Sequence, residues 1–155
     1  MITLRDFQTG DEPALRAVFE SAIHGTARRD YSQLQVDTWA PREHDADAWA
    51  VRVQGLAPFV ALIDGAIAGY ADLQPTGYID HFYVSSTAGR QGVGGALMRR
   101  LLARAEALGL AELTSHVSLT AQPFFAHFGF EVVEHRVFDV RGVEMRNALM
   151  RKRLR

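Results

Sequence analysis

The chain has 155 residues, of which 48% are hydrophobic and 23% charged, so it is long enough for one globular domain with a hydrophobic core. Its formal net charge of −1 provides no positive field for nucleic acid or an anionic membrane surface, and we expect neither as a partner. It contains no cysteine, which excludes disulfides, thiolate catalysis and cysteine-ligated zinc.

The first half of the chain predicts a strand, then helices, then three strands in a meander. Its predicted elements are a strand over 2–7, a helix from Thr9 to about His24, helical segments over 32–40 and 45–53, and strands over 58–63, 67–74 and 78–84. Asp64-Gly65, between the first two strands of the meander, is a strong hairpin signal.

The second half alternates helices and strands. It predicts a helix from Val93 to a stop at Gly109, a strand over 112–117, a short helix over 121–127, and a hairpin of strands over 130–140 and 143–150. The whole order predicts a mixed α/β fold, with a largely antiparallel sheet flanked by helices, in a single domain over 1–155. No signal peptide is evident, and no apolar run approaches the roughly 18 residues of a membrane span, so we expect a cytoplasmic protein.

A glycine-rich loop lies between the third strand of the meander and the long helix. It reads Gly89-Arg90-Gln91-Gly92-Val93-Gly94-Gly95-Ala96. A helix N-terminus presents unpaired N–H groups and a positive dipole end, and glycines let the backbone approach a phosphate. The dinucleotide fingerprint does not fit because the loop follows the fourth strand, and the Gly-Lys-Ser/Thr of a nucleotide P-loop is absent. The loop is therefore either a pyrophosphate site or only a turn and helix start.

Two segments resemble the GNAT family, the Gcn5-related N-acetyltransferases. Phe82-Tyr83-Val84 followed by the glycine loop is similar to the family's strand and Gln/Arg-x-x-Gly-x-Gly/Ala motif, although Gly89 stands at the first loop position. The segment from Ser118 through Ala121 and Phe124-Phe125 to Gly129-Phe130 is similar to a second family motif. The resemblance covers nearly the whole chain and is to a bacterial subgroup of uncertain substrate.

The resemblance implies the GNAT fold and acetyl-CoA as co-substrate, bound where the fourth and fifth strands separate. The backbone of 82–84 would pair with the pantetheine arm, and an N–H group, that of Val84, would polarise the thioester carbonyl. The implied cofactor-binding residues are Phe82, Tyr83, Val84, Gly89, Arg90, Gln91, Gly92, Val93, Gly94, Gly95, Ala96, Ser118, Ala121, Phe124 and Phe125. No histidine spacing indicates a metal site, so none is expected.

Family members transfer the acetyl group by direct attack of a neutral amine, which requires a base to remove the ammonium proton. Asp80 is the first candidate, because strand alternation places it on the same face as Phe82 and Val84. His116 on the next strand is the second. The alternative for each is structural: Asp80 as a paired carboxylate and His116 as a partly buried strand histidine.

The usual general acid of the family is missing. Many relatives carry a tyrosine where this chain has Phe125, which has no proton to donate. Because a thiol has a pKa of about 8.5, the thiolate is a fair leaving group unaided. Tyr83 or Tyr31 is the candidate substitute.

The resemblance places the acceptor amine between the first two helices and the last hairpin, where His24, Arg28, Arg29, Tyr31 and Trp39 gather. The expected function is N-acetyl transfer to a primary amine of a small molecule or peptide, and homodimers are common in the family. The alternatives are a non-catalytic acyl-CoA sensor, and an enzyme that modifies protein N-termini, lysines or aminoacyl-tRNA.

Overall fold

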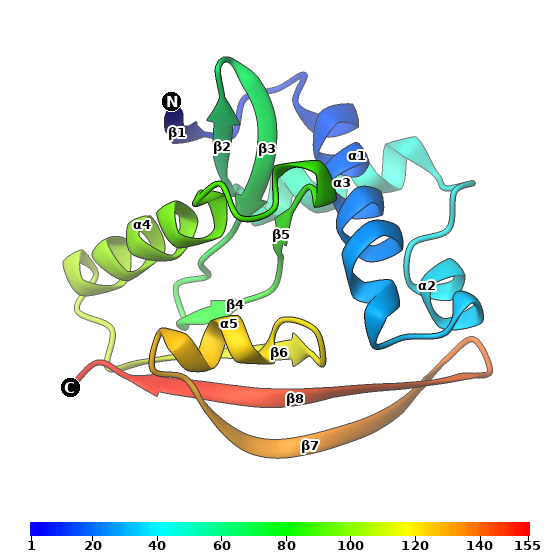
Figure 1. Cartoon of the computed structure of the whole chain (residues 1–155). Helices are drawn as coiled ribbons and strands as arrows, with labels where there is room; N and C mark the ends of the chain where they lie inside the picture. The colour runs from blue at the N-terminus through cyan, green and yellow to red at the C-terminus, as the bar shows by residue number, and fades with distance from the viewer.

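The computed structural model describes all residues from Met1 to Arg155. It contains eight strands in two four-stranded sheets, with helices around them (Figure 1). The first sheet has the order β1-β2-β3-β5 and the second the order β4-β6-β8-β7. The mixed α/β class with largely antiparallel sheets is confirmed. No helix is long and apolar enough to cross a membrane.

The strands and helices follow the predicted order. The strands are β1 (Ile2–Asp6), β2 (Phe59–Ile63), β3 (Ala66–Ala71), β4 (Tyr78–Ile79), β5 (Phe82–Val84), β6 (Glu112–Ser118), β7 (Glu131–Val140) and β8 (Val143–Arg153). The α-helices are α1 (Glu12–Ser21), α2 (Gln33–Trp39), α3 (Ala46–Leu56), α4 (Val93–Ala107) and α5 (Gln122–His127). Shorter helical turns are η1 (Ala22–Thr26), η2 (Ala27–Arg29) and η3 (Ser86–Ala88).

The local signals explain where several helices begin. Pro13 lies in the first turn of α1, and Ser32 forms a capping box with Gln35 at the start of α2. Asp45 accepts two backbone N–H groups at the start of α3, which then runs three residues further than predicted, to Leu56. The predicted helix to His24 is α-helical only to Ser21, because the chain then widens into the π-helical turn η1.

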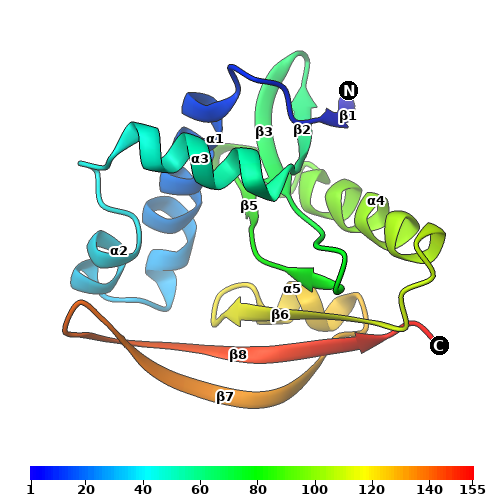
Figure 2. The same ribbon diagram turned by 180° about the vertical axis from the view of Figure 1, so that it is seen from behind.

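Two hydrophobic cores separate the helices into two groups. One core lies around α4 and α5, with Leu97, Met98 and Leu101 fully buried. The other lies under α1, α2 and α3, with Leu15, Ile23 and Val53 fully buried. Figure 2 shows α3 crossing the back of the first sheet, on the opposite side from α4. Trp49 of α3 is buried in this second core and donates its indole N–H to the Glu12 carbonyl at 2.8 Å.

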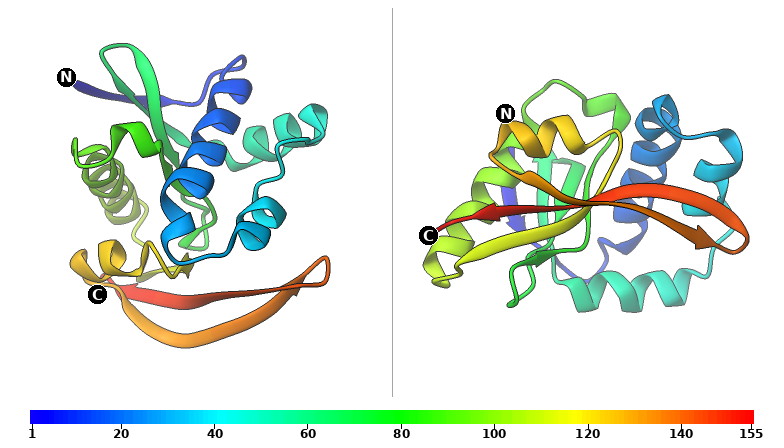
Figure 3. Two further views of the ribbon diagram at one scale, coloured as in Figure 1. Left: turned by 45° about the vertical axis from the view of Figure 1, so that its right-hand side comes forward. Right: turned by 90° about the horizontal axis from the view of Figure 1, so that it is seen from below.

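The predicted single strand over 78–84 is wrong. The chain forms β4 in the second sheet, where it pairs in parallel with β6, and then β5 in the first sheet, where it pairs antiparallel with β3. Asp80 and His81 connect the two sheets. Figure 3 shows the result, with the long β7–β8 hairpin lying under β6 and the first sheet standing above it.

Candidate functional site: two cavities meeting at Tyr83

The buried carboxylate of Asp72 stabilises the break between β4 and β5. One of its oxygens accepts the backbone N–H groups of Asp80 at 2.9 Å and His81 at 2.6 Å, and the Asp72 N–H donates to the His81 carbonyl at 3.1 Å. Gln74 donates to the other oxygen. These bonds replace the strand pairing that the chain loses here. An acidic residue after the apolar strand β3 was the available sequence signal, and sequence reasoning missed it.

The break changes which side chains share a face. Phe82 and Val84 line a cavity beside α4, whereas Asp80 lines a different cavity beside the β7–β8 hairpin. The predicted common face of Asp80, Phe82 and Val84 is therefore wrong, because strand alternation does not continue through an interrupted strand. His81 points into the core, where Tyr70 Oη lies 3.0 Å from its Nδ1. Burial lowers the pKa of His81 to about 4, so it is neutral at pH 7.

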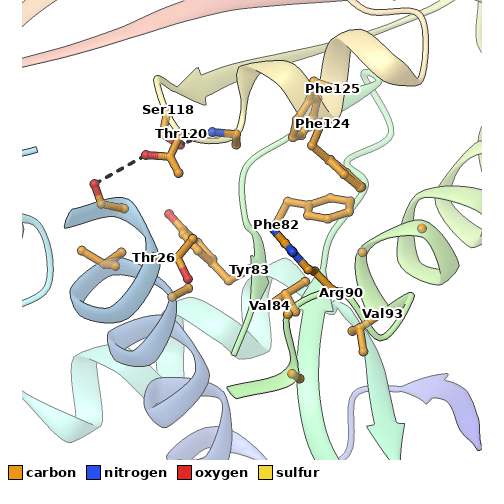
Figure 4. A pocket seen from close by; sticks show the side chains of 18 of the residues that line it. Thr26, Phe82, Tyr83, Val84, Arg90, Val93, Ser118, Thr120, Phe124 and Phe125 are labelled. Carbon is orange, nitrogen blue, oxygen red and sulfur yellow. Dashed lines mark hydrogen bonds between the residues drawn. The ribbon is translucent and has the colours of Figure 1, made fainter. Parts of the chain in front are cut away.

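The first cavity, which we name the glycine-loop cavity, has a volume of about 410 Å³ (Figure 4). It lies between η1, β5, the start of α4 and the segment leading into α5. Of the implied cofactor-binding residues, all except Gln91 and Ala96 line it. The remaining lining residues are Trp39, which was predicted for the acceptor site, and six that were not predicted: Ala22, Ile23, Thr26, Ala27, Ala88 and Thr120. Ala22, Ile23 and Thr26 belong to the π-helical turn η1, and the sequence pattern did not indicate this departure from a regular α-helix.

The glycine loop leaves the N-terminus of α4 open to the cavity. Gly92 takes a left-handed conformation (φ 87°), and no side chain caps the helix. The first backbone N–H groups of α4 therefore lack intrahelical partners. A Cβ on Gly94 would lie 3.1 Å from the Phe124 ring, so a larger residue would narrow the cavity. Open N–H groups and a helix dipole form an anion site that fits a phosphate.

The strand β5 has one free edge, because it pairs only with β3 in its sheet. The Ser85 N–H points toward β3, where it donates to the Ala68 carbonyl at 2.8 Å. Since successive N–H groups of a strand point in opposite directions, the Val84 N–H points to the free edge. This free edge can pair with an extended ligand, the role that the family resemblance implies for the backbone of 82–84.

Neither predicted substitute acid is a free surface phenol. Tyr31 Oη accepts the Leu119 N–H at 3.0 Å and donates to the Arg146 carbonyl, so the turn before α2 is connected to the end of β6 and to β8. Tyr83 lies between the two cavities, and burial raises its pKa, so its phenol keeps its proton. Phe125 is buried against Phe82 and Phe130.

The second cavity, which we name the hairpin cavity, has a volume of about 240 Å³. Its walls mix aromatic, polar and charged side chains, which come from Tyr31, α2, the β4–β5 segment, β6 and the β7–β8 hairpin. Its lining residues are Tyr31, Thr38, Trp39, Tyr78, Asp80, Tyr83, His116, Ser118, Phe138, Val140, Arg141, Met145, Arg146 and Asn147. Trp39, Tyr83 and Ser118 line both cavities, so the two cavities meet at these side chains.

The two candidate bases, Asp80 and His116, lie in the hairpin cavity together. Asp80 forms an ion pair with Arg52 of α3 at 2.6 Å. His116 Nδ1 lies 2.9 Å from the hydroxyl of Tyr78, a residue that sequence reasoning did not select. Burial, with a smaller effect of Arg136, lowers the pKa of His116, so its imidazole is neutral at pH 7.

The five predicted acceptor residues do not form one group. Tyr31 and Trp39 line the hairpin cavity. His24 Nε2 instead lies 2.7 Å from the Ala40 carbonyl, and Arg28 and Arg29 are exposed and line neither cavity. Arg28 and Arg29 follow the π-helical turn on η2, which turns them to solvent. No group of three or more His, Cys, Asp or Glu side chains is placed to hold a metal.

Comparison with known proteins agrees with this architecture. Residues 27–154 match the family model for the acetyltransferase (GNAT) domain. The chain is 33% identical over 150 residues to the uncharacterized N-acetyltransferase YafP of Escherichia coli, covering 97% of this chain and 95% of YafP.

Solved structures show the same arrangement. A GCN5-related N-acetyltransferase structure from Rhodopseudomonas palustris, also described as a class-II aminotransferase, has a TM-score of 0.92 and 30% identity, with 98% of this chain and 95% of that chain covered. The PaiA N-acetyltransferase of Thermoplasma acidophilum, in complex with coenzyme A, shares the fold with a TM-score of 0.72, 17% identity and 99% coverage of both chains. With two sheets that separate at β4–β5, a glycine loop opening α4 and a matching family model, the chain belongs to the GNAT acetyltransferases.

Proposed function

We propose that this single-domain chain transfers an acetyl group from acetyl-CoA to a primary amine of a small molecule, by direct attack. The observation that carries the proposal is the meeting of two cavities at Tyr83, Trp39 and Ser118. A thioester in one cavity and an amine in the other would come together there without either leaving its own site. Such positioning is a major source of rate acceleration for reactions between two molecules.

The glycine-loop cavity suits acetyl-CoA. The open N–H groups of α4 fit the pyrophosphate, and the free edge of β5 fits the amide-containing pantetheine arm. PaiA, which shares the fold, was crystallised with coenzyme A. The Val84 N–H at the free edge would donate to the thioester oxygen as negative charge develops on it, and such donors are worth about 10²–10³ in rate.

The reaction needs little help at the leaving group. The amine nitrogen attacks the thioester carbon, the C–S bond breaks and the thiolate of CoA leaves. A thiol pKa of about 8.5 makes this thiolate a fair leaving group, so Phe125 in place of a tyrosine does not exclude turnover. The neutral phenol of Tyr83, which lines both cavities, is the proposed proton donor to the thiolate.

The size of the hairpin cavity and the contacts between α2 and the hairpin favour a small acceptor over a lysine in a folded protein. The cavity measures about 240 Å³, and the hairpin is attached to α2 on one side. Gln35 donates to the Glu144 carbonyl at 2.8 Å, and Arg141 donates to the Thr38 carbonyl. A polypeptide segment would have to break these bonds to pass through, whereas a small amine would not.

Thiol release from acetyl-CoA over a panel of primary amines and short peptides tests the proposal. The panel should contain alkylamines, arylamines, amino acids and peptides with a free N-terminus or lysine. We expect turnover with at least one small amine and little with peptides. Binding of acetyl-CoA without turnover on any amine would identify an acyl-CoA sensor instead, and faster turnover of peptides would identify a protein-modifying enzyme.

A further inference from the structure

Tyr78 and His116 form a hydrogen-bonded pair on the wall of the hairpin cavity. They lie on the neighbouring parallel strands β4 and β6, where Tyr78 pairs with Thr114, two residues before His116. Tyr78 Oη lies 2.9 Å from His116 Nδ1, and the two rings meet edge to face at 5.6 Å. Both line the cavity, and His116 is also exposed to solvent.

The direction of this hydrogen bond follows from the protonation of its members. Burial raises the pKa of Tyr78, so the phenol keeps its proton and donates it to Nδ1. His116 is neutral, with its proton on Nε2. The charged groups near His116 have opposing effects on its pKa: Arg136 lowers the pKa, whereas Asp80 and Glu134 raise it. Burial has the largest effect, so the pKa of His116 is lowered overall. Arg52 is paired with Asp80.

The alternative base, Asp80, already has a strong partner. Its carboxylate accepts a 2.6 Å bond from the Arg52 guanidinium, which would lose its counter-ion if Asp80 took up a proton. The Tyr78–His116 pair has no such partner to lose. Ser118, which lines both cavities, lies two residues beyond His116 on the same face of β6.

From this geometry we propose that Tyr78 and His116 act as a two-residue proton relay for the acceptor amine, an inference that rests on the proposed function. The ammonium group of the acceptor donates to Tyr78 Oη. As the ammonium proton moves to Oη, the original phenol proton moves to His116 Nδ1. The products are a neutral amine, an unchanged phenol and an imidazolium, which releases its Nε2 proton to solvent. Tyr78 contacts the substrate, and His116 receives the charge.

The test uses the best acceptor amine of the panel and measures kcat/KM from pH 6 to pH 10. At neutral pH most of the amine is ammonium and needs the relay, whereas at high pH the free amine dominates and does not. We expect Tyr78→Phe and His116→Gln each to lower kcat/KM about 10²-fold near pH 7, the lower range for acid–base catalysis, with most of the loss recovered at pH 10. The double variant should lose no more than either single variant, because both remove one relay.

His135→Gln is the matched control, because His135 lies exposed on β7 and lines neither cavity. A loss that is equal at pH 7 and pH 10 would indicate a structural role and overturn the relay. A loss of kcat/KM in Asp80→Asn alone would also overturn the relay, because Asp80 would then be the base. If the wild-type protein turns over no amine, the proposed function fails and the relay fails with it. If it turns over an amine while both variants keep wild-type profiles, only the relay fails.

A second measurement does not depend on turnover. NMR titration of the His116 ring in wild type and Tyr78→Phe reports the hydrogen bond directly. Loss of a donor to the neutral imidazole should raise the pKa of His116 in the variant. An unchanged pKa would show that the two side chains do not interact in solution and would overturn the pairing.

Discussion

Replacing Asp72 with alanine should destabilise the protein much more than replacing it with asparagine. One Asp72 oxygen accepts the N–H groups of Asp80 and His81 at 2.9 and 2.6 Å. Alanine leaves both groups without an acceptor, at about 1–3 kcal/mol each. Because the Asp80 N–H is only partly buried, we expect a total of about 2–4 kcal/mol. Asparagine keeps an oxygen in place and should cost about 1 kcal/mol.

Urea unfolding at several pH values measures both variants and tests the sign of the titration. Burial raises the pKa of Asp72 in the folded protein above its ordinary value of 3.8. The folded state therefore binds the proton more tightly than the unfolded state, and this stabilisation is lost as the pH rises from 3.8 through the raised pKa. Asparagine does not titrate, so wild type should lose stability relative to Asp72→Asn across this window. Equal stability of the alanine and asparagine variants would refute the reasoning.

Two further predictions concern the cavities. Gly94→Val should weaken coenzyme A binding at least tenfold, measured by calorimetry, because its Cβ would lie 3.1 Å from the Phe124 ring. Gly55→Ala on α3 is the control and should bind coenzyme A normally, because a Cβ there meets nothing within 4 Å. Tyr31→Phe removes a hydroxyl that bonds two backbone groups and should cost about 1–3 kcal/mol of unfolding free energy. It should leave the alkaline limb of the rate profile unchanged, and a shifted limb would instead make Tyr31 the acid.

Much of the glycine-loop cavity was predictable because its signals are local. The glycines before α4, of which Gly92 takes a positive φ, are close neighbours in the sequence. The residues of the Ser118 to Phe130 segment are also close neighbours. Their resemblance to family motifs then indicates which residues share a cavity. The η1 lining could not be predicted, because a π-helical turn keeps the same apolar residues and changes only their angular placement.

The hairpin cavity was predicted less well, because its geometry depends on contacts between distant residues. Tyr78 becomes a candidate site residue only through the parallel pairing of β4 with β6, which places His116 beside it. The ion pair between Arg52 and Asp80 likewise joins residues from a helix and a strand connection. The charge of Arg28 and Arg29 favours a role in acceptor binding, but the helical turns before them direct both side chains to solvent.

The interrupted strand explains how one short segment contributes to both cavities. In a continuous strand, Asp80, Phe82 and Val84 would share a face and would line a single site. The break at Asp80 and His81 moves the chain from one sheet to the other, so Asp80 faces the hairpin cavity and Phe82 the glycine-loop cavity. The same separation leaves one edge of β5 unpaired, and that edge is where an extended ligand can bind. Asp72 is therefore as important to the two-cavity arrangement as any residue that lines it, since its carboxylate takes the N–H groups that the break releases.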